Sequence, residues 1–232
     1  MLTFSNIYKK FGETVVFENF CDEFENNCVN CIFGPSGSGK TTLLNLAAGN
    51  LAPDAGRIVN APKNVSYVFQ EERLIPQKTA YKNLEFILSG KYPDKNELKT
   101  VINSFLDSAG LSAAKDLYPR EMSGGMKQRL SLIRAFAYRS DALLMDEPFK
   151  ALDFSLKENI AETFLKYFAA DRRTTLFVTH EPDDAALIGD YVHIYSDKPM
   201  KLIKKLKIPG EKGKRTLHSA EITEFKKIFY TN

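Results

Sequence analysis

The segment GPSGSGKT, from Gly34 to Thr41, has residue types and a spacing suited to binding phosphate groups. It fits the pattern G-x-x-x-x-G-K-[ST] and lies between a predicted strand and a predicted helix. Its glycines would let backbone N–H groups approach phosphate oxygens at a helix N-terminus. Lys40 would reach the outer phosphates, and the Thr41 hydroxyl would ligate Mg²⁺. The alternative is a plain glycine turn before a helix.

Two carboxylates follow another apolar run, ALLMDE. A strand that ends at Asp146 would place this carboxylate at the edge of the sheet where ligands bind in open α/β folds. There Asp146 would hold Mg²⁺ through water, and Glu147 would act as general base for an attacking water. The alternative is a pair of solvated acids. Together with the glycine-rich segment, these acids would suit kinases, GTPases and many ATPases.

A third feature is the run MSGGMKQRL, residues 122 to 130. Glycine inside a helix costs roughly 0.5–1 kcal/mol relative to alanine, so two adjacent glycines need a reason. Ser123 would cap the helix, and the bare N–H groups of Gly124 and Gly125 would form an anion site. We expect that a Cβ at either glycine would push this backbone away from a phosphate.

These residues need a framework, and predicted strands alternate with predicted helices along the chain. The strands are predicted at 29–34, 64–70, 142–146, 174–180 and 191–196, and the helices at 40–49, 80–88, 94–110, 124–139, 154–170 and 182–188. This alternation predicts an α/β fold with a mostly parallel sheet covered on both faces. No strand is evident between Thr79 and Ala137, which predicts an inserted helical subdomain.

Composition narrows the class of protein further. The chain has 232 residues with a net charge of +3, which gives little support for nucleic-acid binding. No apolar run approaches the roughly 20 residues that span a bilayer, and the N-terminus lacks an apolar signal segment. We therefore expect a protein that is made and kept in the cytosol. The cysteines Cys21, Cys28 and Cys31 are expected to be small apolar fillers rather than a metal or redox site.

Over essentially its whole length, the sequence resembles the ATP-binding cassette (ABC) ATPases. The signature motif of the family is resembled by Ser123 to Gly125 with Gln128-Arg129, and the Walker A motif by Gly34 to Thr41. The Walker B motif is resembled by Asp146-Glu147, the Q-loop by Gln70, and the D-loop by Ala151 to Asp153. His180 resembles the switch histidine, and Phe11 resembles the aromatic residue that stacks on adenine. The resemblance implies one ABC ATPase domain, 1–232, with a P-loop NTPase three-layer core. It also implies a helical insert at roughly 77–140 and a small antiparallel β subdomain.

The resemblance further implies ATP and Mg²⁺ as ligands. ATP would contact Phe11, Gly34, Pro35, Ser36, Gly37, Ser38, Gly39, Lys40, Thr41, Thr42, Gln70, Ser123, Gly124, Gly125 and Asp153. Mg²⁺ would be held by Thr41, Gln70 and Asp146, and catalysis would fall to Glu147, His180 and Lys40. In the family, two cassettes form a head-to-tail dimer, so Ser123 to Gly125 would serve the ATP of a second copy or of a related cassette.

The residues around these motifs resemble those of the importer ATPases for nitrate, sulfonate, taurine and similar small solutes. Relatives in that subfamily serve thiamine precursors. The matching stretches are FQEERLIP, YPREMSGGMKQRL, MDEPFKALD, VTHEPDDA and YSDKP. This implies a peripheral protein on the cytoplasmic face of the plasma (inner) membrane. Its partners would be transmembrane permease subunits, which dock after Gln70, and indirectly a solute-binding protein, with no nucleic acid.

Two positions depart from these relatives, and other functions stay open. Met122 replaces a leucine with little change in volume, and Lys150 stands where relatives have glycine. We expect Lys150 to be a solvated surface lysine; the alternatives are a place at the dimer seam or near a phosphate. The basic segment 198–215 predicts an edge strand with one solvated face, or a surface facing anionic lipids. Competing functions are an exporter, lipoprotein extraction, a soluble ABC ATPase and a nucleotide kinase.

Overall fold

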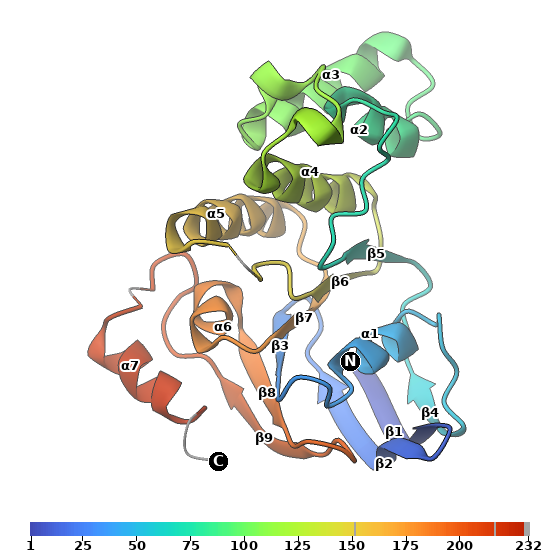
Figure 1. The fold of residues 1–232 in the computed structure, drawn as a ribbon, viewed down its shortest axis with the longest axis vertical. Helices are drawn as coiled ribbons and strands as arrows, with labels where there is room; N and C mark the ends of the chain where they lie inside the picture. Colours follow the sequence, from blue (N-terminus) through green and yellow to red (C-terminus); the bar gives the residue numbers. More distant parts are fainter. Residues whose placement is uncertain (151, 216, 230–232) are drawn as a thin grey trace.

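The main sheet is built from short apolar strands that alternate with helices along the chain (Figure 1). The computed structural model describes residues 1–150, 152–215 and 217–229. The strand order is β5-β6-β7-β3-β8-β9, and all neighbours pair in parallel except β8 and β9. The strands are β3 (Val29–Phe33), β5 (Val65–Val68), β6 (Ala142–Asp146), β7 (Thr174–Thr179), β8 (Tyr191–Tyr195) and β9 (Leu202–Lys207).

A second, antiparallel sheet of order β2-β1-β4 packs over one face of the main sheet. Its strands are β1 (Leu2–Phe11), β2 (Thr14–Phe24) and β4 (Ala55–Val59). Buried phenylalanines from β1 and β2, among them Phe4 and Phe20, share an apolar cluster with Ile32 of β3 and with helix α1 (Lys40–Ala47). This cluster fixes α1, and with it the end of the glycine-rich segment, against both sheets.

Helices cover the opposite face of the main sheet. They are α4 (Gly124–Ala137), α5 (Phe154–Ala170) and α6 (Pro182–Ile188), followed near the C-terminus by α7 (Ala220–Lys227), which contacts α6. Phe136 and Phe164 pack in one core cluster with Phe177 of β7. The prediction of a mostly parallel sheet covered on both faces is therefore confirmed.

The remaining helices gather with α4 at one end of the molecule, at the top of Figure 1. They are α2 (Ala80–Leu88), α3 (Lys95–Ser108) and the short 3-10 turns Ser112–Ala114 and Pro119–Glu121. They enclose an apolar cluster of their own, which includes Ile102, Met122 and Leu130. The predicted cap at Ser123 is confirmed, and Thr79 and Asp94 cap their helices in the same way, because each of the three side chains accepts a backbone N–H of the helix that follows. That the chain is one cassette domain with this insert stays a prediction.

Two details differ from expectation or need comment. Cys31 is buried in β3 as expected, but Cys21 is exposed on β2, so the apolar-filler prediction is wrong there. The predicted edge strand in the basic segment is confirmed as β9, which pairs only with β8 in its sheet. In the part of the chain that the structure describes, no helix has the length and apolar character that crossing a bilayer requires.

Candidate functional site

The register of the parallel strands brings the predicted site residues to one edge of the main sheet. Phe33 of β3 lies opposite Thr179 of β7, and Asp146 of β6 lies opposite Val178. The chain segments that leave these strands, which carry Gly34, Glu147 and His180, therefore start side by side. They come from three separate regions of the sequence, and only the sheet joins them.

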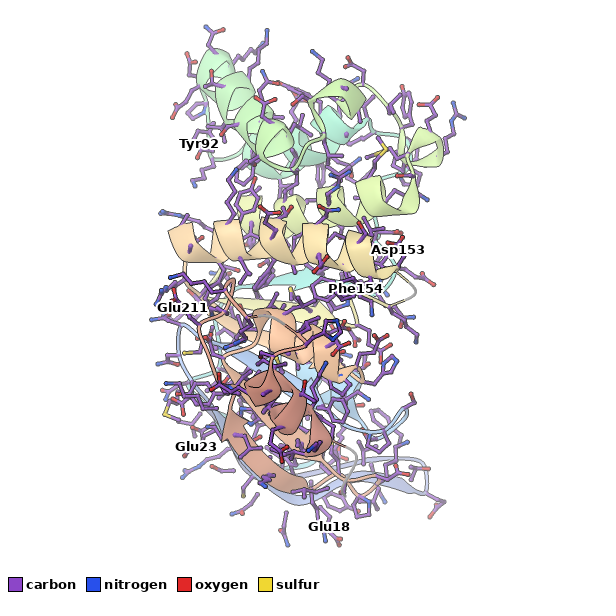
Figure 2. All side chains as sticks on the ribbon, turned by 90° about the vertical axis from the view of Figure 1, so that its left-hand side faces the viewer. Glu18, Glu23, Tyr92, Asp153, Phe154 and Glu211 are labelled. Carbon is purple, nitrogen blue, oxygen red and sulfur yellow. The ribbon has the colours of Figure 1, made fainter. Side chains whose placement is uncertain are left out.

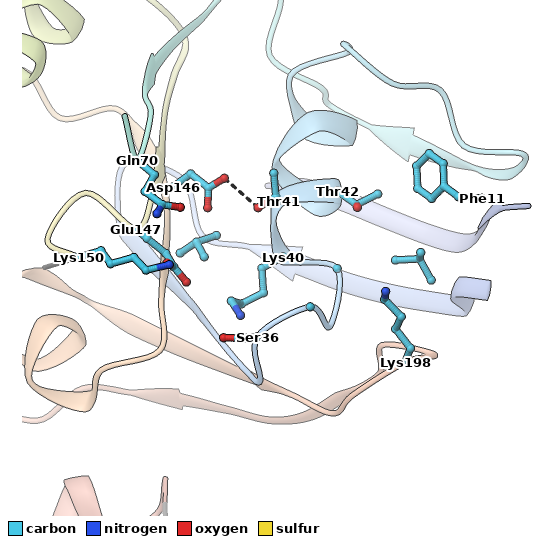
Figure 3. Close-up of a pocket in the computed structure, with 14 residues that line it drawn as sticks. Phe11, Ser36, Lys40, Thr41, Thr42, Gln70, Asp146, Glu147, Lys150 and Lys198 are labelled. Atoms are coloured by element: carbon cyan, nitrogen blue, oxygen red, sulfur yellow. Dashed lines mark hydrogen bonds and ion pairs between the residues drawn. The ribbon is translucent and has the colours of Figure 1, made fainter. Parts of the chain in front are cut away.

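A cavity of about 340 Å³ opens at this edge (Figure 3). The residues that line it are Phe11, Val16, Ser36, Gly37, Gly39, Lys40, Thr41, Thr42, Gln70, Asp146, Glu147, Lys150, Val178 and Lys198. The structure thus brings together most of the predicted nucleotide contacts and all three predicted metal ligands. Gly34, Pro35 and Ser38 belong to the same loop. The cavity lining does not include Ser123 to Gly125 or Asp153.

The loop from Gly34 to Gly39 is shaped for a close ligand. Gly37 and Gly39 have φ angles of 79° and 119°, in the left-handed region that side chains rarely adopt. A Cβ on Gly39 would lie only 2.6 Å from Val16 Cγ1. The buried hydroxyl of Ser38 has no hydrogen-bond partner among the described residues, which leaves a donor inside the loop. These features fit a bound phosphate.

Lys40 supplies positive charge to this loop. Its ammonium is buried and donates to the carbonyl oxygens of Gly34 (2.9 Å) and Pro35 (2.7 Å). Burial lowers the pKa of Lys40, and the nearby carboxylates of Glu147 and Asp146 oppose that shift. The ammonium is therefore held by neutral carbonyl groups, which a phosphate could displace.

Thr41 and Asp146 form the candidate metal site. The Thr41 hydroxyl donates to Asp146 Oδ2 at 2.9 Å, drawn as the dashed line in Figure 3. Burial raises the pKa of Asp146, and the Thr41 hydrogen bond opposes the shift. No group of three or more His, Cys, Asp or Glu side chains that could hold a metal occurs in the described ranges. One carboxylate and a hydroxyl fit Mg²⁺, which proteins usually bind together with substrate phosphates and water.

Glu147 is held from two sides. Its Oε1 accepts from His180 Nδ1 at 3.1 Å, and its Oε2 pairs with the Lys150 ammonium at 2.9 Å. Burial alone would raise the pKa of Glu147, but the hydrogen bonds and charges of Lys150 and His180 outweigh it and lower the pKa. Its φ of 47° is unusual for glutamate and marks the site as locally strained. Lys150 is exposed, as expected of a solvated lysine, but its ammonium also pairs with Glu147 at this cavity.

The motif around Ser123 lies away from the cavity at the start of α4. A Cβ built on Gly124 would meet open space beyond its own helix turn, but a Cβ on Gly125 would lie 2.6 Å from Leu156 Cδ1. The sequence argument for Gly125 is therefore incomplete, because a residue of the same chain already excludes a side chain there. Gly124 is the glycine with open space.

Asp153 has a role within its own helix. Its carboxylate accepts the backbone N–H of Leu156 at 3.0 Å and so caps α5. Figure 2 shows Asp153 and Phe154 together at that end of the helix. The neighbouring Ala151, part of the predicted D-loop, lies outside the described residues.

Sequence reasoning did not assign four residues that line the cavity: Val16, Lys150, Val178 and Lys198. Val16 contacts the loop because the antiparallel sheet folds over α1, and Lys198 reaches the cavity from the turn between β8 and β9. Of these residues, only Lys150 could be singled out from the sequence, because it stands where related ATPases have glycine, close to Glu147. The other three placements depend on tertiary packing.

Comparisons with known proteins agree with this geometry. A family profile described as ABC transporter matches residues 20–150. The aliphatic sulfonates import ATP-binding protein SsuB of Bacillus cereus is 34% identical over 223 residues, covering 92% of this chain and 88% of that protein. The formylaminopyrimidine import ATP-binding protein ThiZ of Halalkalibacterium halodurans is 35% identical over 189 residues, covering 81% and 76%.

A solved structure gives the same answer for the fold. It is a dimeric post-hydrolysis state of an ATP-binding cassette bound to ADP and Pi. It matches with a TM-score of 0.77 and 28% identity, and the match covers 91% of this chain and 100% of that one. The expected fold class, a P-loop NTPase core of the ABC type, is thereby confirmed. The chain belongs to the ABC transporter family of ATP-binding proteins and is an ATPase.

Proposed function

We propose that this chain hydrolyses ATP with Mg²⁺ to energise an importer for a small solute of the nitrate, sulfonate, taurine or thiamine-precursor kind. The observation that carries the ATPase chemistry is the cavity lined by Lys40, Asp146 and Glu147, with His180 bonded to Glu147 from outside the lining. The names of the relatives support import as the direction of transport.

In this proposal each residue has one task. The loop from Gly34 to Gly39 and Lys40 bind the β- and γ-phosphates, while Thr41, Gln70 and Asp146 hold Mg²⁺, which when bound neutralises phosphate charge. Glu147 accepts the proton of the attacking water, and His180 holds the Glu147 carboxylate in place. Phe11, which is half exposed at the mouth of the cavity, stacks on adenine.

The proposal includes a head-to-tail dimer. The site within one chain lacks the signature residues, and Gly124 presents open space at a helix start capped by Ser123. These bare N–H groups would approach the phosphates bound to a second copy or a related cassette. The dimeric state of the solved cassette supports this arrangement.

An apolar groove supports docking to a permease subunit. A cavity of about 330 Å³ lies between the segment after β5 and helices α2 and α4, and it is lined mainly by Tyr67, Phe69, Ile75, Phe86 and Tyr138. Phe86 is 65% exposed and adds a large apolar surface to this groove. Ile75 belongs to the segment after Gln70 for which docking is expected. Docking there would hold the chain on the cytoplasmic face of the inner membrane.

Co-purification tests this function. The tagged chain, expressed in its own source cells, is expected to recover a membrane subunit, and Phe86→Asp is expected to lose it. Val59→Asp, an exposed apolar residue on β4, is the matched control and should retain the subunit. A ligand screen on the co-purified solute-binding protein then identifies the solute. Recovery of no membrane subunit by the unmodified chain would contradict the proposal and favour a soluble ABC ATPase.

A further inference from the structure

The ion pair between Lys150 and Glu147 has no function in the mechanism proposed above. The Lys150 ammonium lies 2.9 Å from Glu147 Oε2, while His180 Nδ1 takes Oε1 at 3.1 Å. Both oxygens of the carboxylate are therefore engaged. Figure 3 shows the Lys150 side chain extending toward Glu147 at the cavity wall.

A rigid turn places Lys150 there. The backbone N–H of Lys150 donates to the carbonyl of Glu147 at 3.1 Å, which closes a four-residue turn with Pro148 in its second position. Phe149 anchors the turn, since it is 1% exposed and its ring packs edge-on against Phe177 at 5.5 Å. Gln128 of α4 also donates to the Pro148 carbonyl. The backbone of Lys150 is therefore held beside Glu147, although its side chain is 46% exposed.

The charges in the cavity give this pair a consequence for ligand binding. Glu147 and Asp146 put two carboxylates into the cavity that the phosphates of ATP would enter. The Lys40 ammonium donates to the carbonyls of Gly34 and Pro35 and, among the described residues, makes no ion pair with Glu147, although the two charges attract each other. An unpaired Glu147 would repel the γ-phosphate in a partly buried site, where Coulomb interactions are stronger than in water.

We propose that Lys150 is a charge-compensating residue of the nucleotide site, which neutralises Glu147 and so lets the γ-phosphate of ATP enter beside this carboxylate. The inference rests on the proposed ATP cavity and adds a residue to it. The effect of Lys150 on ATP binding therefore depends on the γ-phosphate and on the charge of Glu147. A lysine that contacted phosphate directly would act whether or not residue 147 carried a charge.

A double-mutant cycle separates these cases. ATP and ADP affinities are measured by titration calorimetry in EDTA, which prevents turnover, at a protein concentration where light scattering shows a monomer. The four proteins are the unmodified chain, Lys150→Met, Glu147→Gln and the double variant. Lys150→Met is expected to weaken ATP binding about five- to tenfold in the unmodified background, but less than about twofold in the Glu147→Gln background. ADP affinity should change little, and Lys150→Arg should restore ATP affinity.

Lys198→Met is the matched control, because Lys198 lines the same cavity on the side of Phe11 (Figure 3). Its effect on ATP affinity should be the same in both backgrounds. An equal loss for Lys150→Met in both backgrounds, or no loss in either, would overturn the inference. Failure of the unmodified chain to bind ATP would instead contradict the proposed function, so the two failures are distinguishable.

Discussion

Leu156, in the first turn of α5, fills the space beside Gly125 of α4, so that a Cβ on Gly125 would lie 2.6 Å from Leu156 Cδ1. Gly124, the preceding residue, faces open space. One glycine is thus required by packing inside the chain, while the other is left free on the surface. This difference separates a structural role from a role toward a second molecule.

Gly124→Ala is expected to leave the free energy of unfolding unchanged or raise it by about 0.5–1 kcal/mol, because alanine favours the helix. ATP turnover should fall about tenfold or more, because the new methyl group stands between the helix start and the phosphate of a partner. Urea denaturation and a phosphate-release assay measure the two effects. Full turnover in Gly124→Ala would contradict the proposed role of this face in the dimer.

Gly125→Ala is expected to behave differently. It should lower the free energy of unfolding by roughly 1–2 kcal/mol, because Leu156 must move. Combining it with Leu156→Ala should give a smaller loss than the sum of the two single losses. Strict additivity in urea denaturation would show that this contact does not explain the glycine.

Thr41→Val removes the hydroxyl that donates to Asp146 and that we assign to Mg²⁺. The Mg²⁺ concentration for half-maximal turnover is expected to rise about tenfold or more. Thr41→Ser keeps the hydroxyl and serves as control, with a near-normal Mg²⁺ requirement. A Thr41→Val protein with an unchanged Mg²⁺ titration would remove Thr41 from the metal site.

Phe11→Ala tests the stacking residue. Phe11 is 50% exposed, so its loss should leave stability nearly unchanged while ATP affinity falls about tenfold, in line with the loss of one stacked base. Phe11→Tyr keeps the ring face and should bind ATP normally. Calorimetric titration would decide against stacking if Phe11→Ala bound as tightly as the unmodified chain.

Asp22 ties the antiparallel sheet to the main sheet through buried polar groups. It accepts a hydrogen bond from His193 Nδ1 at 2.8 Å and another from the Tyr195 hydroxyl, both on β8. Asp22→Ala leaves these donors unpaired and should lower the free energy of unfolding by about 3 kcal/mol. Tyr195→Phe removes one donor and should cost about 1 kcal/mol. Equal losses in urea denaturation would show that Asp22 does not organise the network.

Much of this structure could be predicted from local patterns. The helix at 154–170 and the cap at Ser123 agree with prediction, because capping and apolar periodicity act over a few residues. Cavity residues from separate strands were also expected together, because parallel strands share one carboxyl edge.

What could not be predicted depends on long-range packing. The strands at 2–11, 14–24 and 55–59 were not placed individually, since their half-exposed residues gain stability mainly from pairing with each other. The pairing of Lys150 with Glu147 requires a turn anchored by buried Phe149. The contact of Gly125 with Leu156 joins two helices, and no local pattern reports it.

Glu147→Gln tests the central claim, that Glu147 is the general base at an ATP site completed by a second copy. The variant should bind ATP, lose at least about a hundredfold in turnover, and accumulate as a dimer in size-exclusion chromatography with light scattering. Glu18→Gln, the same change at an exposed position (Figure 2), should retain normal turnover. A Glu147→Gln protein that stays monomeric with ATP and hydrolyses it at the unmodified rate would contradict the account.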